Sequence, residues 1–516
     1  MFLSQFENVM ATLNYFTAFS IVESYKKFIF KKYSIEKVVV SGGGAFNKVL
    51  MDHLQALLNP IPVVDSQCLG MPVQSKEPIA FAFFAWQTLK GKINHLPQTT
   101  GASRSMILGK ITPGKNFMRL FTVLISLFLL SNISVWAKVQ LGIDVLQSQG
   151  FEMLQGKRVG LITNHTGKNN RGKSTIDILF NAPGGKLVAL FSPEHGIRGK
   201  AEHGAIITDS IDQKTQLPIF SLYGKNKRPT SEMLKNIDVL VFDMQDIGTR
   251  FYTYTTTLAY ALEEASKHSI EFIVLDRPNP ILGSVIEGEI LEPQIQHFTA
   301  YLNVPVRHGL TVGEIAQWHN LKKELNAKLR VVPMKNWKRE MRWFETGLNF
   351  NPTSPNIRTV NAALLYSGIG GFEATNISVG RGTRKPFEVI GAPWIDSEVV
   401  MERLKFLNLE EFKFSKILFQ PKEDLYEKEV CHGIQIEIKD SEQARPVELF
   451  IYLLTLLIEL YPEEMQVKWE EMLRIVGSEK INYLLQQKVS AEEIIQIIRD
   501  GSNTFRESRK KILLYK

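Results

Sequence analysis

The chain has 516 residues, a length that predicts about three domains. Of these residues 44% are hydrophobic and 22% charged, a composition that excludes an intrinsically disordered protein. The net charge of +8 is uneven, because residues 1–117 hold 12 Lys and Arg against 6 Asp and Glu, whereas residues 138–516 hold 48 against 47. The larger part therefore lacks the basic footprint of a nucleic-acid-binding protein. Cys68 and Cys431 lie far apart, which excludes a disulfide framework and predicts two buried free thiols.

The first recognisable pattern is a strand, a glycine-rich turn and a helix. Three valines at residues 38–40 predict the strand, and a helix is expected to end near Leu57. The turn between them contains Gly42, Gly43, Gly44 and Asn47. Such a turn lets backbone N–H groups approach a phosphate or nucleoside, although structural turns use the same glycines.

Further segments around this turn carry a family resemblance. Residues 8–13, 76–82 and 100–103, together with the turn, resemble the C-terminal quarter to third of anhydro-N-acetylmuramic acid kinases. These are cytoplasmic sugar kinases of the actin/hexokinase-like fold, so residues 1–117 are expected to be a partial kinase lobe derived from a cytoplasmic protein. The lobe with the family's catalytic aspartate is absent. The turn is therefore expected to be the remnant of a nucleotide site without a reaction.

Residues 118–137 have the composition of a secretory signal peptide. Met118 and Arg119 precede an apolar run that ends at Leu130, which is shorter than a bilayer span. Val135 and Ala137 fit a cleavage site, so residues 138–516 are expected to be periplasmic or secreted, with membrane contact only through this segment. A buried helix or a membrane anchor is the alternative. The internal position indicates two joined reading frames.

Residues 138–395 alternate apolar strands with helices. The four predicted strands are residues 157–164, 186–191, 238–243 and 271–276. Continuous apolar strands indicate a parallel sheet covered on both faces, and residues 256–267 predict one covering helix. The expected fold class is α/β, with a Rossmann-like sheet subdomain and a smaller α/β subdomain at residues 396–516. That second part predicts helices at 447–460 and 491–498 and no chemistry.

Polar side chains follow each predicted strand. Ligands bind at the carboxyl ends of strands in open parallel sheets, so these side chains predict one site. They are Asn164, Glu194, His195, Arg198, Asp243, Gln245, Asp246, Arg250, Tyr252, Tyr254, Asp276 and Arg277. Asp276 is equally expected as a turn or capping residue. Later loops contribute Glu287, Arg307, His308, Asn356, Glu373, Asn376 and Arg381.

These residue types suit cleavage of a glycosidic bond in an anionic sugar. The reaction needs one carboxylic acid and usually a second carboxylate. Arg250, Arg307 and Arg381 suit an anionic group, although each is equally expected as a structural ion-pair partner. No G-x-G-x-x-G fingerprint follows the first strand, which disfavours NAD. No metal is predicted, and the alternative is a zinc site made of His165, His195 and His308.

Six motifs in order carry a second resemblance. They are SPEHGIRG (192–199), DMQDIGTRFYTY (243–254), LDRPNP (275–280), PVRHGLTVGE (305–314), SPN (354–356) and EATNISVGRGT (373–383). The series is similar to the NamZ-type exo-β-N-acetylmuramidases and spans residues 138–516. The resemblance implies an active cleft between two subdomains, no cofactor, and release of N-acetylmuramic acid from non-reducing ends of peptidoglycan fragments in cell-wall recycling.

Within this resemblance Glu194 is the expected acid/base, and Glu373 or Glu287 is the second carboxylate. The family usually reads Ala-Gly-Glu after the SPEHG motif, whereas residues 201–204 here read Ala-Glu-His-Gly, which leaves the role of Glu202 open. A non-catalytic muropeptide-binding module is the first alternative, and kinase activity of residues 1–117 is the second. The sequence leaves a homodimer open.

Overall fold

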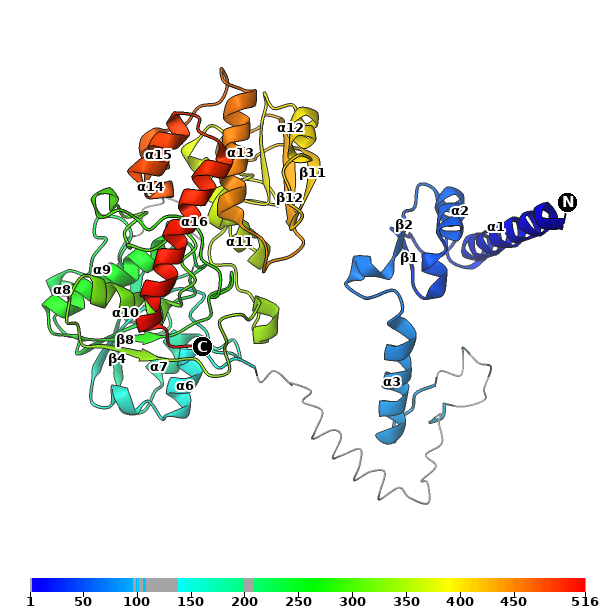
Figure 1. Cartoon of the computed structure of the whole chain (residues 1–516). Helices are drawn as coiled ribbons and strands as arrows, with labels where there is room; N and C mark the ends of the chain where they lie inside the picture. Colours follow the sequence, from blue (N-terminus) through cyan, green and yellow to red (C-terminus); the bar gives the residue numbers. More distant parts are fainter. Residues whose placement is uncertain are drawn as a thin grey trace. The chain divides into compact units, whose positions relative to one another are not determined.

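The structure, a computed structural model, describes residues 2–95, 99, 101, 105–107, 138–198 and 208–515. The chain forms two compact units, residues 1–133 and 134–516 (Figure 1). The predicted signal segment and residues 201–204 lie outside the described residues. Within the described ranges, no helix combines the length and apolar character needed to cross a membrane.

The first unit contains the predicted strand, turn and helix. Its elements are α1 (Phe2–Phe28), β1 (Val38–Val40), η1 (Gly43–Phe46), α2 (Lys48–Leu58), β2 (Val63–Asp65), η2 (Ser66–Leu69) and α3 (Lys76–Leu89). Gly42 has a φ of 85°, which favours glycine there. The Asn47 side chain accepts the Leu50 N–H at 3.1 Å and caps α2. Asn47 therefore has a structural role, and the kinase-lobe assignment stays a prediction.

The first unit buries little apolar surface. Its core cluster is built on four buried residues, Ala18, Val22, Leu54 and Leu58. Large apolar side chains remain exposed along α1 and α3, including Phe16 (62%), Phe81 (71%) and Trp86 (48%). The hydrophobic effect therefore contributes little to its stability. The prediction of two buried thiols is correct for Cys431 and wrong for Cys68, which is exposed.

A seven-stranded sheet organises the second unit. Its order is β5 (Ser210–Ile211), β6 (Pro218–Ser221), β4 (Lys186–Ser192), β3 (Arg158–Thr163), β7 (Val239–Asp243), β8 (Glu271–Leu275) and β9 (Leu329–Val332). Only β5 pairs antiparallel, so the sheet is predominantly parallel. The four predicted strands are its four central strands, which confirms the α/β prediction.

Helices cover both faces of this sheet, as predicted. Val239 and Val241 of β7 pack with α6 (Gly142–Ser148) and α7 (Thr175–Phe180). Leu240 and Phe242 point to the other face. There they pack with α8 (Ser231–Leu234), α9 (Thr253–Lys267) and α10 (Val312–Lys322). Thr311 and Glu314 form a capping box that starts α10. Short 3-10 helices η3 (Glu152–Leu154), η4 (Pro293–Ile295) and η5 (Trp343–Thr346) lie in the connections.

A second layer packs on the face covered by α9 and α10. It contains the antiparallel strands β10 (Val389–Ala392), β12 (Cys431–Ile438) and β11 (Phe412–Phe419), in that order. Its helices are α11 (Val360–Ile369), η6 (Gly370–Ala374), α12 (Ser397–Leu404), α13 (Pro446–Leu460), α14 (Trp469–Val476), α15 (Glu479–Gln486), α16 (Ala491–Ser508) and η7 (Arg509–Ile512). The two helices predicted at 447–460 and 491–498 are confirmed as α13 and α16.

One continuous hydrophobic cluster joins the two layers. It includes Leu258 of α9, Leu365 of α11 and Leu453 of α13. Helix α16 runs beside α13 and on towards α10 (Figure 1), where Phe505 packs on Trp318 with ring centres 5.0 Å apart. The shared core fixes the second layer against the sheet.

We expect residues 138–516 to fold without the first unit, because their core is internal to the second unit. Expressed alone, they should unfold cooperatively within about 2 °C of the main transition of the full chain, measured by circular dichroism. A shift of more than 5 °C would show that the first unit stabilises the second. Residues 1–117 expressed alone should bind a hydrophobic dye strongly.

Candidate active site

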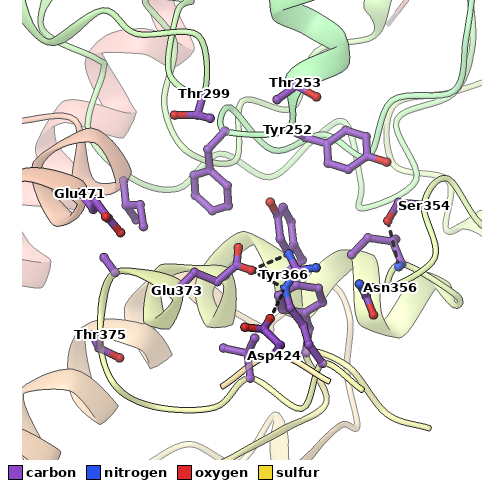
Figure 2. A pocket seen from close by; sticks show the side chains of 18 of the residues that line it. Tyr252, Thr253, Thr299, Ser354, Asn356, Tyr366, Glu373, Thr375, Asp424 and Glu471 are labelled. Carbon is purple, nitrogen blue, oxygen red and sulfur yellow. Dashed lines mark hydrogen bonds and ion pairs between the residues drawn. The ribbon is translucent and has the colours of Figure 1, made fainter. Parts of the chain in front are cut away.

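A cavity of about 490 Å³ lies where the loops of the parallel sheet meet the second layer. Its walls come from the loop after β4, the start of α9, the residues around 354–357, the helices α11 and η6, and α14. Figure 2 shows Tyr252 and Thr253 on one side and Glu373 and Tyr366 on the other. The volume falls in the usual range for small-molecule sites.

Six of the residues predicted from the sequence line this cavity. They are Glu194, His195, Tyr252, Asn356, Glu373 and Arg381. The candidate carboxylates Glu194 and Glu373 therefore share one cavity, although they come from different layers.

Glu194 lies two residues after β4 and is 4% exposed. Its Oε2 accepts a hydrogen bond of 2.6 Å from Oγ1 of Thr253, the first residue of α9. Burial, and then the Glu194 carboxylate that accepts the Tyr223 hydroxyl hydrogen, raise the pKa of Tyr223 above its usual value. Two hydroxyl groups thus orient the carboxyl group of Glu194.

The backbone after Glu194 is strained. His195 has a φ of 68°, a left-handed conformation that is unfavourable for a residue with a side chain, and Gly196 follows with a φ of 72°. Together they turn the chain sharply at the end of β4, which keeps Glu194 and His195 in the same cavity wall. Strain of this kind concentrates at functional sites.

Glu373 is held by an arginine. Its Oε1 accepts the Arg381 Nε–H at 2.6 Å, and Arg381 also lies 3.6 Å from an Asp424 oxygen (Figure 2). Burial opposes the charge of Arg381, but Glu373, Tyr366 and Asp424 together outweigh burial and raise the pKa of Arg381. Arg381 is therefore shared between two carboxylates and fixes the position of Glu373.

Tyr366 of α11 lines the cavity and was not predicted. Burial raises the pKa of Tyr366 well above its usual value, and the charges of Glu373 and Glu194 add to the shift. Its ring lies 4.7 Å from the Phe387 ring and 6.2 Å from the Tyr252 ring, centre to centre. A protonated phenol therefore stands within the field of both carboxylates. Most residues of α11 are apolar and buried, so nothing local marks Tyr366.

Residues beyond 396, for which the sequence predicts no chemistry, also reach the cavity. Asp424, Lys468, Glu471 and Arg474 all line the cavity. The reason is the packing of α14 against η6, where the Lys468 N–H donates to the Ala374 carbonyl at 2.8 Å. In sequence, α14 is an ordinary amphipathic helix.

Arg250 lies outside the cavity lining and clamps the two layers together. Its Nη1 donates to the carbonyls of Glu289 (2.7 Å) and Val304 (3.0 Å), and its Nη2 donates to the Ile475 carbonyl (2.6 Å). Gly477 ends α14 with a φ of 76°, and a Cβ there would lie 2.5 Å from Arg250 Nη2. The predicted substrate contact of Arg250 is thus replaced by a structural one.

Arg307 and Glu287 also have structural roles. They form a buried ion pair of 2.7 Å, and Glu287 Oε1 accepts the Val447 N–H at the start of α13. Arg307 donates further to the carbonyls of Ile281 and Ala444. Glu287 therefore lies outside the cavity lining and is not its second carboxylate, and Arg307 is buried and donates to protein groups from Nε, Nη1 and Nη2.

Other predicted ligands at the strand ends form a buried polar network. Arg277 donates two hydrogen bonds to Asp243, at 2.5 and 2.9 Å. Asp276 accepts the Thr311 hydroxyl and the Gly313 N–H at the start of α10, both at 2.8 Å. Hydrogen bonds to neighbouring residues also hold Asn164, Gln245, Asp246, Tyr254 and His308. These residues support the loops rather than line the cavity.

Two predicted ligands lie near the surface. Asn376 bonds the backbone at Glu464 and Gln466, and Arg198 pairs with Asp212 at 3.1 Å. Neither lines the cavity.

The zinc alternative finds no support in contacts. His165 Nε2 lies 2.6 Å from the Pro352 carbonyl oxygen, and His308 Nδ1 accepts the Leu310 N–H at 3.1 Å. In the part of the chain that the structure describes, no three His, Cys, Asp or Glu side chains gather as metal ligands would.

The fold and the cavity define an α/β protein whose small-molecule cavity is lined by several carboxylates, Glu194 and Glu373 among them, the kind of group that glycoside hydrolases use. The model of the family "Exo-beta-N-acetylmuramidase NamZ, N-terminal" matches residues 159–361, and its C-terminal counterpart matches residues 364–515. The peptidoglycan β-N-acetylmuramidase NamZ of Bacillus subtilis (strain 168) is 44% identical over 379 residues, which cover 73% of this chain and 92% of that protein. The chain belongs to the NamZ exo-β-N-acetylmuramidase family.

Solved structures agree with this assignment. A DUF1343 family protein from Bacteroides fragilis NCTC 9343 superposes with a TM-score of 0.69 at 38% identity, over 73% of this chain and 99% of that one. A second DUF1343 protein from the same strain gives a TM-score of 0.61 at 28% identity, over 74% of this chain and 99% of that one.

The first unit matches a different family. The anhydro-N-acetylmuramic acid kinase model covers residues 3–114. The kinase of Caldanaerobacter subterraneus subsp. tengcongensis is 40% identical over 105 residues, which are 20% of this chain and 26% of that kinase. The chain thus spans about a quarter of the kinase length.

Asp246 should make stability depend on pH. Burial raises its pKa from 3.8 to about 7, so the folded state holds a proton that the unfolded state has lost between these values. The free energy of unfolding should therefore fall as pH rises through this window. Relative to Asp246→Asn, wild type should lose on the order of 3 kcal/mol between pH 5 and pH 8, measured by urea unfolding. A constant difference between the two proteins would contradict this.

Removing the Arg250 clamp should destabilise the second unit. Arg250→Met leaves three buried carbonyl groups without donors, at a cost of about 3 kcal/mol or more in unfolding free energy. The control is Arg403→Met, which removes an exposed ion pair with Glu459 and should cost less than about 0.5 kcal/mol. Equal losses in the two variants would refute the clamp.

Proposed function

We propose that residues 138–516 are an exo-β-N-acetylmuramidase that releases N-acetylmuramic acid from non-reducing ends of peptidoglycan fragments. Membership of the NamZ family supports the reaction. The observation that carries the mechanism is that Glu194 and Glu373, from different layers, line the same cavity.

Glu194 is the proposed general acid. It is nearly buried, its Oε2 is held by Thr253, and the strained turn at His195 keeps it in the wall. As the glycosidic C–O bond breaks, Glu194 gives its proton to the departing oxygen, and the anomeric carbon becomes electron-deficient. Glu373 supplies the second carboxylate, as base for water or as nucleophile, with Arg381 fixing its position.

The proposed location follows from the substrate and from residues 118–137. Peptidoglycan lies outside the cytoplasm, so a signal peptide that ends at Ala137 would deliver the hydrolase to it.

The test is release of N-acetylmuramic acid from a muramic-acid-terminated disaccharide by the purified chain. Glu194→Gln should lower kcat by a hundredfold or more, because the amide has no proton to give. Glu459→Gln, at an exposed carboxylate paired with Arg403, is the matched control and should retain full activity.

Two outcomes would contradict this proposal. Binding of the disaccharide by a folded wild type without turnover would favour the muropeptide-binding module. Full activity of Glu194→Gln would remove Glu194 as the acid.

A further inference from the structure

The sequence predicts that Arg250, Arg307 and Arg381 bind the anionic group of the substrate. In the structure each of them already donates to other groups of the protein. Arg250 and Arg307 give their hydrogens to buried carbonyls and to Glu287. Arg381 is shared by Glu373 and Asp424. A carboxylate on the sugar therefore needs another cation in the cavity.

Helix α14 and the residue before it supply such cations. Lys468, Glu471 and Arg474 are spaced by three residues, so they share one helix face, and all three line the cavity. Lys468 lies 3.6 Å from Glu471. Arg474 is half-buried and forms no ion pair with any described residue. Arg474 is thus a guanidinium in the wall whose charge is not already neutralised.

The positive charge of Arg474 acts on His297, which lines the same cavity. Burial lowers the pKa of His297, and the positive charges of Arg474 and Lys227 lower it further. His297 and Thr299 line the cavity beside α14, and Figure 2 shows Thr299 and Glu471 on the same side. Lys468 and Arg474 thus bring two positive charges to a wall that also carries Glu471, and a cation without an ion-pair partner favours an anion beside it.

The α14 wall is held rigidly. The Lys468 N–H donates to the Ala374 carbonyl at 2.8 Å at one end, and Arg250 Nη2 donates to the Ile475 carbonyl at 2.6 Å at the other. Ala374 follows Glu373 directly, so the same contact ties the wall to the second carboxylate. The backbone that carries Arg474 is therefore held at both ends, which limits the reorganisation of this wall when a ligand binds.

We propose that Arg474, assisted by Lys468, binds the lactyl carboxylate that distinguishes N-acetylmuramic acid from N-acetylglucosamine. This inference rests on the proposed function and names the group that selects its substrate. The planar guanidinium can donate two parallel hydrogen bonds to a carboxylate. A sugar without the lactyl group leaves Arg474 desolvated and unpaired, which disfavours its binding.

The experiment compares substrates that differ only in this group. The full chain is assayed on the para-nitrophenyl β-glycosides of N-acetylmuramic acid, of its lactyl methyl ester and of N-acetylglucosamine. Wild type should prefer the free acid. Arg474→Gln should raise KM for the acid at least tenfold, with kcat changed less than threefold, and should erase the preference over the ester. Arg474→Lys should restore part of it.

Controls separate this inference from folding and from the reaction itself. Arg403→Gln, at an exposed arginine, should match wild type, and melting curves should show each variant folded. If Arg474→Gln keeps the acid-to-ester ratio of wild type, Arg474 is not the selecting group. If wild type hydrolyses none of the glycosides, the binding of N-acetylmuramic acid is measured by calorimetry. Equal binding by wild type and Arg474→Gln overturns the inference. Loss of binding in the variant supports it.

Discussion

The buried guanidinium of Arg250 is the contact on which the geometry of the cavity depends. A charge at 1% exposure is costly unless its hydrogens find acceptors. Arg250 Nη1 and Nη2 donate three hydrogen bonds to carbonyls from both layers, those of Glu289 and Val304 on one side and Ile475 on the other, while the Nε is without a partner among the described residues. A displacement of α14 would break the hydrogen bond from Nη2 to the Ile475 carbonyl, so a buried polar contact as well as the shared hydrophobic core holds the two layers together.

That constraint explains how two carboxylates from distant parts of the chain can act on one sugar. Glu194 is carried by the end of β4 and by α9, whereas Glu373 is carried by η6, against which α14 packs. The buried pair of Arg307 and Glu287 adds a second link between the sheet loops and α13. Polar residues at the strand ends thus hold the layers together, and the carboxylates in the cavity depend on them for position.

The sequence predicts the architecture well because a strand that is buried on both faces is apolar along its whole length. Strands β3, β4, β7 and β8 are continuous apolar runs, a pattern that only a sheet covered on both faces requires. The site is predicted in part. Glu194, His195 and Glu373 reach the cavity, but Arg250 and Asp243 follow strands in the same way and are buried supports. Tyr366 and Arg474 could not be found, since each lies on a helix whose own sequence shows only packing, and tertiary contacts alone turn them to the cavity.

The two units differ in how much of their apolar surface they bury. In the first unit Phe16, Phe81 and Trp86 stay exposed on the helices α1 and α3, and its core cluster is built on four buried residues. In the second unit one cluster runs from the parallel sheet through α9 and α11 to α13. Burial of apolar surface stabilises a fold by about 25 cal/mol for each Å². A unit that leaves so much apolar area in water therefore gains little free energy from folding. The stability of the cavity therefore comes from the second unit, where every contact described for Glu194, Glu373 and Arg474 also lies.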